Sequence, residues 1–275
     1  MNARVRHVGM IDSGLGGLTV LTALRNLLPD VDVTYFADTA HVPYGDRPLD
    51  EVALFGRQMI EWLTPLDPAL IIVASGTTCA AFEASGGVTS KVRQLGIAEL
   101  GAAAGIRASK TLNIGVVATH GTIASGIFER KIHALQPAAI VTSVAAPALV
   151  PIVEGGEWNS ERARTAVDSY LQPVRTANCD TLILGCTHFP HLSRWFSTVL
   201  RPSVAIVDPA EACAQACADA LAGDEPGDGR LLFAVSGDVE DFARHALQLS
   251  GLVANDTRRV TFPGAHSTAS SGARG

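Results

Sequence analysis

Short apolar runs rich in valine and isoleucine recur along the chain, and longer helical patterns lie between them. The runs read HVGMI, VDVTYFA, LIIVA, IAEL, NIGVVA, AIVTSVA, TLILG, VAIVD and RLLFAVSG. The helical patterns include GLTVLTALRNLL, DEVALFGRQMIEWL and SERARTAVDSYLQPVRTA. This alternation is typical of parallel sheets covered by helices, so the sequence predicts an α/β fold.

One strand-and-helix plan occurs twice in the chain. HVGMIDSG is echoed by NIGVVATHG, and LIIVASGTTCAA is echoed by TLILGCTHFPHL. Because ligands of open parallel sheets bind beyond the carboxyl ends of the strands, we expect a site in a cleft between two facing halves. The strand ends concerned are at Asp12, Ser75, Thr119 and Cys186.

Composition narrows the classes of function. A chain of 275 residues that is 47% hydrophobic can bury one large core or two smaller ones. The net charge of −6 without a basic run argues against a nucleic-acid partner and favours a small molecule. No apolar run approaches the ~20 residues that span a bilayer, and the first strand begins too early for a signal peptide. We therefore expect a cytoplasmic protein without a membrane partner.

The cysteines and histidines show no metal or disulfide pattern. The five cysteines lack CxxC spacing, so we expect reduced thiols. No set of carboxylates or thiolates completes a metal site around His188 and His191, and His120 is interpreted as a residue at the edge of the cleft. No GxSxG motif supports a serine hydrolase built on Ser75.

Two polar loops follow the first two strands. In DSGLGGL, Asp12 either caps the next helix or addresses an ammonium group or a catalytic base, and the glycines fit neither a Walker motif nor GxGxxG. In DTAHVPYGDR, Pro43 and Gly45 fix a turn around Tyr44. The backbone amides of Tyr44 and Gly45 are candidates for binding a carboxylate.

The segment LILGCTHFP carries the most chemistry. Cys186 follows a buried strand and precedes a helix, where helix-terminal amides favour a thiolate, and Thr187 and His188 lie beside it. Glu154 in VPIVEGG either ends a helix or reaches into the cleft. The remaining cysteines of the second half and the C-terminal part are interpreted as inert core residues. These are Cys179, Cys213 and Cys217.

Together, these segments resemble the glutamate racemase family of the aspartate/glutamate racemase superfamily. The resemblance runs from about Val8 to Gly264 and rests on DSGLGGLTV, DTAHVPYG, VEGG, DTLILGCTHFP and SGD in this order. It implies two doubly wound α/β lobes related by pseudo-twofold symmetry. We expect the first lobe to comprise residues 1–99 plus 208–265 and the second 100–207, and we expect HSTASSGARG at 266–275 to be disordered.

The resemblance also implies an isomerase that needs neither a cofactor nor a metal and that supplies D-glutamate for peptidoglycan in a bacterial cytoplasm. Homodimers are common in the family. Two cysteines face opposite sides of the substrate α-carbon, so that one thiolate removes the α-proton while the opposite thiol returns one. Donors around the carboxylate stabilise the carbanion, because no pyridoxal ring accepts its charge.

By this match, Cys186 occupies one catalytic cysteine position, and His188 and Asp12 are the neighbours that tune it and orient the substrate. The substrate is expected to be a small acidic amino acid or a related carboxylate. The implied substrate-contact positions are Asp12, Ser13, Pro43, Tyr44, Gly45, Gly76, Thr77, Thr119, Glu154, Thr187 and His188.

The other catalytic position departs from the family pattern. Ser75 stands where the usual motif ACNT has cysteine, and Gly76 stands at its asparagine. Because a hydroxyl is a far weaker acid than a thiol, Ser75 cannot simply inherit the work of a thiolate. Cys79 lies one helical turn further on, and we predict that it packs in the core instead of replacing the missing thiol.

Three functions are open at this point. The chain is an amino-acid racemase in which Ser75 acts through a relayed water or Cys79 replaces it. Alternatively, it is a single-cysteine enzyme similar to arylmalonate decarboxylases, in which Cys186 protonates a carbanion from one face and the GTT segment at 76–78 binds a carboxylate. The third alternative is a catalytically silent relative that binds an acidic ligand or a protein partner.

Overall fold

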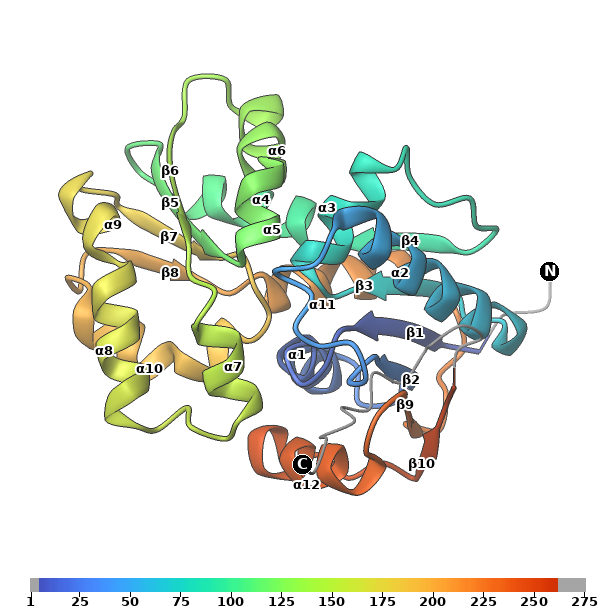
Figure 1. Ribbon diagram of the computed structural model, residues 1–275. Helices are drawn as coiled ribbons and strands as arrows, with labels where there is room; N and C mark the ends of the chain where they lie inside the picture. The colour runs from blue at the N-terminus through green and yellow to red at the C-terminus, as the bar shows by residue number, and fades with distance from the viewer. Residues whose placement is uncertain (1–4, 262–275) are drawn as a thin grey trace, which may run out of the picture.

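The computed structural model describes residues 5–261, which form two parallel β-sheets with helices on both faces of each sheet (Figure 1). The six-stranded sheet has the order β10-β9-β2-β1-β3-β4, and the four-stranded sheet has the order β6-β5-β7-β8. The strands of the first sheet are β1 (His7–Asp12), β2 (Asp32–Ala37), β3 (Leu70–Val73), β4 (Arg93–Gly96), β9 (Leu231–Val235) and β10 (Asp256–Arg259). Those of the second are β5 (Asn113–Ala118), β6 (Ile140–Ala145), β7 (Thr181–Leu184) and β8 (Ala205–Val207).

Each sheet has a hydrophobic core on both of its faces. In β1, Met10 packs in one core and Ile11 in the other, because successive side chains of a strand point to opposite faces. Val116 and Val117 divide between two cores in the same way in β5. Neighbouring strands are parallel throughout both sheets. The predicted α/β class with doubly wound sheets is therefore confirmed.

The helices of the two sheets supply these four cores. Around the six-stranded sheet lie α1 (Leu18–Leu27), α11 (Pro209–Ala220) and α12 (Val239–Ser250) on one face, and α2 (Leu49–Leu63) and α3 (Gly76–Ala84) on the other. The short η1 (Thr64–Leu66) follows α2 directly and has no buried residue. Around the four-stranded sheet lie α7 (Leu149–Glu154), α8 (Glu161–Tyr170), α9 (Gln172–Thr176), η2 (Phe189–Leu192) and α10 (Ser193–Val199) on one face. Its other face carries α4 (Ile97–Ala108) and α6 (Ile127–Leu135), and α5 (His120–Ser125) follows β5.

The repeat predicted from the sequence exists in the strand order. The run β2-β1-β3-β4 of the first sheet has the same order of connections as β6-β5-β7-β8 of the second. β1 and β3 are neighbours, with Ile11 paired to Val73, and β5 and β7 are neighbours in the same way. The carboxyl ends of these four strands therefore bring four short polar segments toward the space between the sheets.

Some local predictions were wrong. IAEL begins helix α4, and the strand before it is Arg93–Gly96, because a short apolar run is compatible with either element and the small residues after it continue as a helix. β10 was not predicted, because its sequence DTRR contains no hydrophobic residue and therefore lacks the apolar pattern of a strand.

The lobe boundaries stay predictions. The boundary expected between residues 99 and 100 falls inside α4, and the one between 207 and 208 coincides with the end of β8. The expected disordered tail, 266–275, lies outside the described residues. In the described part of the chain, no helix is long and apolar enough to cross a membrane.

Candidate active site

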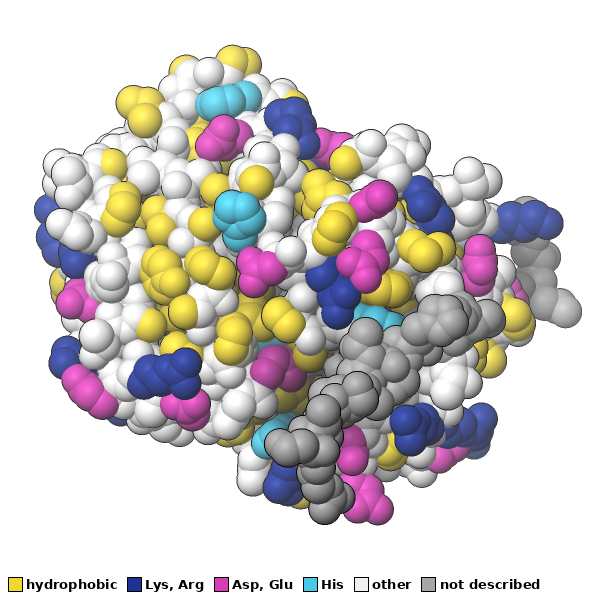
Figure 2. Space-filling view, in the orientation of Figure 1, with side chains coloured by type: hydrophobic (Ala, Val, Ile, Leu, Met, Phe, Trp, Pro, Cys, Tyr) yellow, Lys and Arg dark blue, Asp and Glu magenta, His cyan; other side chains and the backbone are white. Residues whose placement is uncertain are grey.

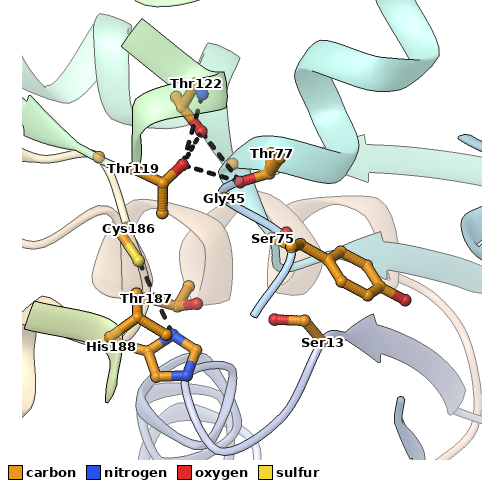
Figure 3. A pocket seen from close by; sticks show the side chains of 13 residues that line it. Ser13, Gly45, Ser75, Thr77, Thr119, Thr122, Cys186, Thr187 and His188 are labelled. Atoms are coloured by element: carbon orange, nitrogen blue, oxygen red, sulfur yellow. Dashed lines mark hydrogen bonds between the residues drawn. The ribbon is translucent and has the colours of Figure 1, made fainter. Parts of the chain in front are cut away.

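A cavity with about 300 Å³ of empty space lies where the strand ends of the two sheets meet (Figure 3). Most of the predicted site residues line it, namely Ser13, Tyr44, Gly45, Ser75, Gly76, Thr77, Thr119, Cys186, Thr187 and His188. Three further lining residues were not predicted from the sequence, namely Thr122, Val150 and Gly185.

One wall of the cavity holds a thiol that is coupled to two ionisable side chains. The Sγ atom of Cys186 lies 3.7 Å from Nδ1 of His188, and Nε2 of His188 lies 2.5 Å from Oε1 of Glu154. Burial by itself lowers the pKa of His188, but the hydrogen bonds and charges of Cys186 and Glu154 outweigh it and raise that pKa well above its ordinary value. The imidazole is therefore held in its charged form beside the thiol.

Glu154 ends a helix, which is one of the two interpretations that its sequence context left open. It is the last residue of α7, and its carboxylate contacts His188. Burial raises the pKa of Glu154, while the hydrogen bond and the charge of His188 lower it by more, so the net shift is downward. The shifts of the two partners agree in favouring an ion pair. Glu154 acts on the cavity through His188 and is not itself part of the lining.

Asp12 lies next to the same wall but outside the lining. Its Oδ1 atom accepts a hydrogen bond from the backbone N–H of Gly14 at 2.9 Å, and its Oδ2 atom accepts one from the Thr187 hydroxyl at 3.1 Å. Burial raises the pKa of Asp12, although the positive charge of His188 opposes the shift. Asp12 does not provide the side-chain cap of α1, whose N-cap residue is Gly17. It instead connects the loop after β1 to Thr187.

The opposite wall holds a hydroxyl without an ionisable partner. Ser75 caps α3, and its Oγ atom accepts a hydrogen bond from the backbone N–H of Thr78 at 3.2 Å. Within residues 5–261, no acidic or basic side chain is hydrogen-bonded to this hydroxyl. Figure 3 shows Ser75 and Cys186 projecting into the cavity from opposite sides. The two walls therefore differ in their capacity to transfer protons.

Three threonines form a hydroxyl cluster above these walls. Oγ1 of Thr77 lies 2.9 Å from Oγ1 of Thr119 and 3.2 Å from Oγ1 of Thr122, and the latter two lie 2.9 Å apart (Figure 3). The cluster joins α3 of one sheet to α5 of the other. The spacing THGT, with Thr119 as the N-cap and Thr122 three residues later, is the signal that identifies Thr122 in the sequence.

The loop after β2 closes the cavity from the side of the six-stranded sheet. Tyr44 donates its hydroxyl proton to Oδ2 of Asp38 at 2.5 Å, and the carbonyl oxygen of Gly45 accepts a hydrogen bond from the N–H of Gly121 at 2.8 Å. The predicted turn is confirmed by the hydrogen bond from Arg47 N–H to the Tyr44 carbonyl. Pro43 follows a cis peptide bond and lies outside the lining. Carboxylate binding by the Tyr44 and Gly45 amides stays a prediction.

The other cysteines lie away from the cavity. Cys79 is half-buried against the cores on either side of α3, and its thiol points to the carbonyl oxygen of Val73 at 3.6 Å. Burial raises the pKa of Cys79 to about 11, so this thiol stays protonated. Its predicted packing role is confirmed. The cysteines predicted to be inert, Cys179, Cys213 and Cys217, are buried.

Two further histidines lie outside the cavity lining. His120 is exposed at the start of α5, and His191 follows the cavity wall in η2. Burial lowers the pKa of His191 to about 4, with the charge of His188 acting in the same direction. Within the described part of the chain, no group of three or more His, Cys, Asp or Glu side chains is arranged to hold a metal ion.

Comparisons with known proteins agree with this architecture. Residues 18–217 match the Asp/Glu/Hydantoin racemase family. The chain is 41% identical over 255 residues to a glutamate racemase of Desulforudis audaxviator, with 89% of this chain and 93% of that protein covered. It is 40% identical over 250 residues to the glutamate racemase of Symbiobacterium thermophilum, covering 89% and 90%.

Solved structures give the same result. The glutamate racemase isoform RacE1 of Bacillus anthracis superimposes with a TM-score of 0.89 at 31% identity, covering 94% of this chain and 98% of that chain. The glutamate racemase of Thermus thermophilus, solved in complex with β-chloro-D-alanine, superimposes with a TM-score of 0.80 at 35% identity, covering 92% and 96%.

Proposed function

The chain belongs to the glutamate racemase family of the Asp/Glu racemase superfamily and is an isomerase of that type, and from this premise we propose that it interconverts L- and D-glutamate with unequal proton transfer at the two faces of the α-carbon. The observation that carries the proposal is the position of Cys186 and Ser75 on opposite walls of one cavity. The thiol wall has a charged imidazole beside it, and the hydroxyl wall does not.

On the thiol wall, Cys186 removes or returns the α-proton. The charged His188 stabilises the thiolate, and Glu154 holds the imidazole by its far nitrogen. Proton transfer by a group positioned in this way typically contributes about 10²–10⁴-fold to a rate. His188 thus serves the role of the tuning neighbour expected from the sequence.

On the hydroxyl wall, Ser75 occupies the position of the missing cysteine. A serine hydroxyl is more acidic than an amino-acid α-carbon and can protonate the carbanion, but as a neutral group it is a poor base. The N–H of Thr78 at the start of α3 points at its oxygen and offsets part of the cost of an alkoxide. We assign the slow proton transfer to this wall, with water relaying the proton to and from Ser75.

The substrate groups between the walls have matching partners. Thr187 donates its only hydroxyl proton to Asp12, so its oxygen is left as an acceptor, which suits the ammonium group of an amino acid. In the threonine cluster, the three hydroxyl protons can all be taken up by the three mutual hydrogen bonds, so a hydroxyl that donates to the α-carboxylate exchanges one of these bonds for a bond to the substrate. Thr187, which the resemblance implies as a substrate contact, is therefore assigned to the ammonium group.

Exchange of the α-proton in D₂O tests the proposal. We expect deuterium to enter both L- and D-glutamate, followed by NMR, and we expect one enantiomer to exchange with retention faster than it racemises, because Cys186 is the better base. Cys186→Ala should abolish both processes. No exchange in either enantiomer contradicts the proposal and favours a silent relative. Release of CO₂ from disubstituted malonates, lost in Cys186→Ala, favours the decarboxylase alternative instead.

Three further features belong to the same proposal. We propose that residues 1–99 plus 208–265 and residues 100–207 form two lobes, that the protein is a homodimer and that it acts in the cytoplasm. The sheets support the first point, since residues of β1 to β4 and of β9 and β10 form one sheet and residues of β5 to β8 form the other. Sedimentation velocity tests the oligomeric state.

A further inference from the structure

The loop that follows β1 touches the residues that hold the thiol of Cys186. We propose that this glycine loop, Ser13-Gly14-Leu15-Gly16-Gly17, is a positioning element that fixes the His188–Glu154 pair and thereby the reactivity of Cys186. The inference rests on the proposed function and adds to it Gly14, Leu15 and Gly16, which do not line the cavity. The glycine loop belongs to the six-stranded sheet, whereas the thiol and its two partners follow strands and helices of the four-stranded sheet.

A backbone amide of the glycine loop makes the central contact. The N–H of Leu15 donates to Oε1 of Glu154 at 2.9 Å, and the same oxygen lies 2.5 Å from Nε2 of His188. One carboxylate oxygen therefore connects the glycine loop to the imidazole. With Nε2 held in this way, the other ring nitrogen of His188 faces Cys186 at 3.7 Å.

The two glycines on either side of Leu15 leave the space that this contact needs. A Cβ atom at Gly16 would lie 2.5 Å from both Nδ1 of His188 and Oγ1 of Thr187, and one at Gly14 would meet Oε1 of Glu154 even more closely. Neither glycine is among the residues with positive φ. Their lack of a side chain is therefore required by the close approach of His188 and Glu154 and not by the backbone conformation.

The glycine loop cannot easily move away from its partners, because its own sheet holds it. The carboxylate of Asp12 accepts the N–H of Gly14 at 2.9 Å, and the Tyr35 hydroxyl donates to the Gly14 carbonyl at 2.8 Å. The hydroxyl of Thr19 donates to the Gly16 carbonyl at 3.1 Å. A methyl group at Gly14 is therefore accommodated by displacement of Glu154, and one at Gly16 by displacement of His188 together with the Thr187 side chain.

The charged groups around His188 determine how strongly its charged form is favoured, and therefore how much a displacement of the imidazole changes. Glu154 and Cys186 favour its charged form, the carboxyl group of Asp12 lies close on the side of the glycine loop, and His191 adds a like charge only when it is protonated. His245 acts on Glu154 from α12. Moving the imidazole away from Glu154 and Cys186 removes the two largest favourable contributions together.

The test compares Gly16→Ala with a matched glycine substitution in the full-length protein. Gly96→Ala is the control, because a Cβ at Gly96 meets only the Cys79 sulfur at 3.4 Å. The readouts are kcat and KM for glutamate racemisation and the rate at which iodoacetamide alkylates Cys186 at pH 7, followed by peptide mass spectrometry. We expect Gly16→Ala to lower kcat and the alkylation rate by roughly tenfold or more, since misplacement of a catalytic group by about 1 Å can cost 10²-fold, and Gly96→Ala to change neither.

A double-mutant cycle with His188→Asn separates positioning from a general structural effect. If the glycine loop acts through His188, Gly16→Ala adds little to the loss that His188→Asn already causes. An equal loss in both backgrounds, or an alkylation rate unchanged by Gly16→Ala, overturns the proposal. Gly14→Ala, which acts on Glu154, replaces Gly16→Ala in the cycle if the latter does not fold, with the same expected and contradicting results. If the alkylation rates of the four proteins in the cycle show the expected pattern but the protein does not racemise glutamate, the proposed function is wrong and the positioning role is retained.

Discussion

The two strand ends that meet at the cavity differ in the segment that comes after each strand. After β3, the chain enters α3 at once, and the side chain of Ser75 accepts the N–H of Thr78 as a helix cap. After β7, helix α10 begins only at Ser193, and the segment between them contains the short η2 element. Cys186 does not cap a helix there and faces the imidazole of His188.

This difference shows that a repeated strand order places residues without fixing their chemistry. Both sheets place a polar residue at the end of an equivalent strand, but only the second places an imidazole and a carboxylate in line behind it. In the six-stranded sheet, the hydroxyl of Ser75 only caps the helix that follows the strand. A proton-transfer group needs a position beside the substrate and a partner that stabilises its charged form. Cys186 has both, with His188 as its partner, whereas Ser75 has the position alone.

Ser75→Cys is expected to have the largest effect, because it makes the two walls alike. A thiol in place of the hydroxyl supplies a base on the second face, and we expect the racemisation rate to rise by about 10²–10⁴-fold. The preference of one enantiomer for exchange with retention should shrink in the same variant. Polarimetry gives the first quantity and NMR in D₂O the second. A rate equal to that of the parent protein means that Ser75 does not limit the reaction.

Glu154→Gln tests the ion pair of the thiol wall through the pH dependence of stability. The raised pKa of His188 contributes stability that is fully present below its ordinary value of 6.5 and is lost as the pH rises through the raised value. The lowered pKa of Glu154 contributes stability that is present above its ordinary value of 4.5 and is lost as the pH falls through the lowered value. The loss caused by Glu154→Gln should therefore be largest between these two ordinary values.

We expect this loss to be about 1.5–3 kcal/mol, the range typical of a hydrogen bond to a charged group. Urea unfolding at several pH values measures it. Glu161→Gln is the control, because it removes a carboxylate from an exposed pair with Arg164. A loss that is the same at every pH would show that His188 and Glu154 do not form an ion pair.

Much of the difference between the two cavity walls could be predicted from the sequence. The rest depends on contacts between segments that are far apart in the chain. The strand ends at Asp12, Ser75, Thr119 and Cys186 were predictable, because apolar runs followed by polar residues identify the carboxyl ends of parallel strands. The proposal that Ser75 departs from the family pattern also comes from the sequence.

Other features had no local signal. The contact between the Leu15 amide and Glu154 joins residues 139 positions apart, and it involves a backbone atom that every residue type except proline carries. The hydrogen bond from the Thr187 hydroxyl to Asp12 likewise joins residues 175 positions apart, on loops that follow strands of different sheets. The helix at IAEL was missed because a short, mainly apolar run fits a strand as well as a helix.

Gly76→Ala tests how closely the two strand ends approach each other. A Cβ atom at Gly76 would lie 2.6 Å from the carbonyl oxygen of Gly185, which is the residue before Cys186. We expect Gly76→Ala to raise KM and to cost about 1–3 kcal/mol of stability, as overpacking does, whereas Gly96→Ala should do neither. Normal KM and stability would show that the contact relaxes freely.

Ser75→Ala has the smallest expected effect on stability and separates the two roles of the hydroxyl. Loss of the cap on α3 should cost about 1 kcal/mol, the usual value for an N-cap serine, and thermal unfolding measures it. Ser160→Ala is the matched control, because Ser160 caps α8 through the N–H of Ala163 and lies outside the cavity lining. Both variants should lose similar stability, but only Ser75→Ala should also lose racemisation. If racemisation survives in Ser75→Ala, the hydroxyl serves α3 alone, and water without Ser75 protonates the second face.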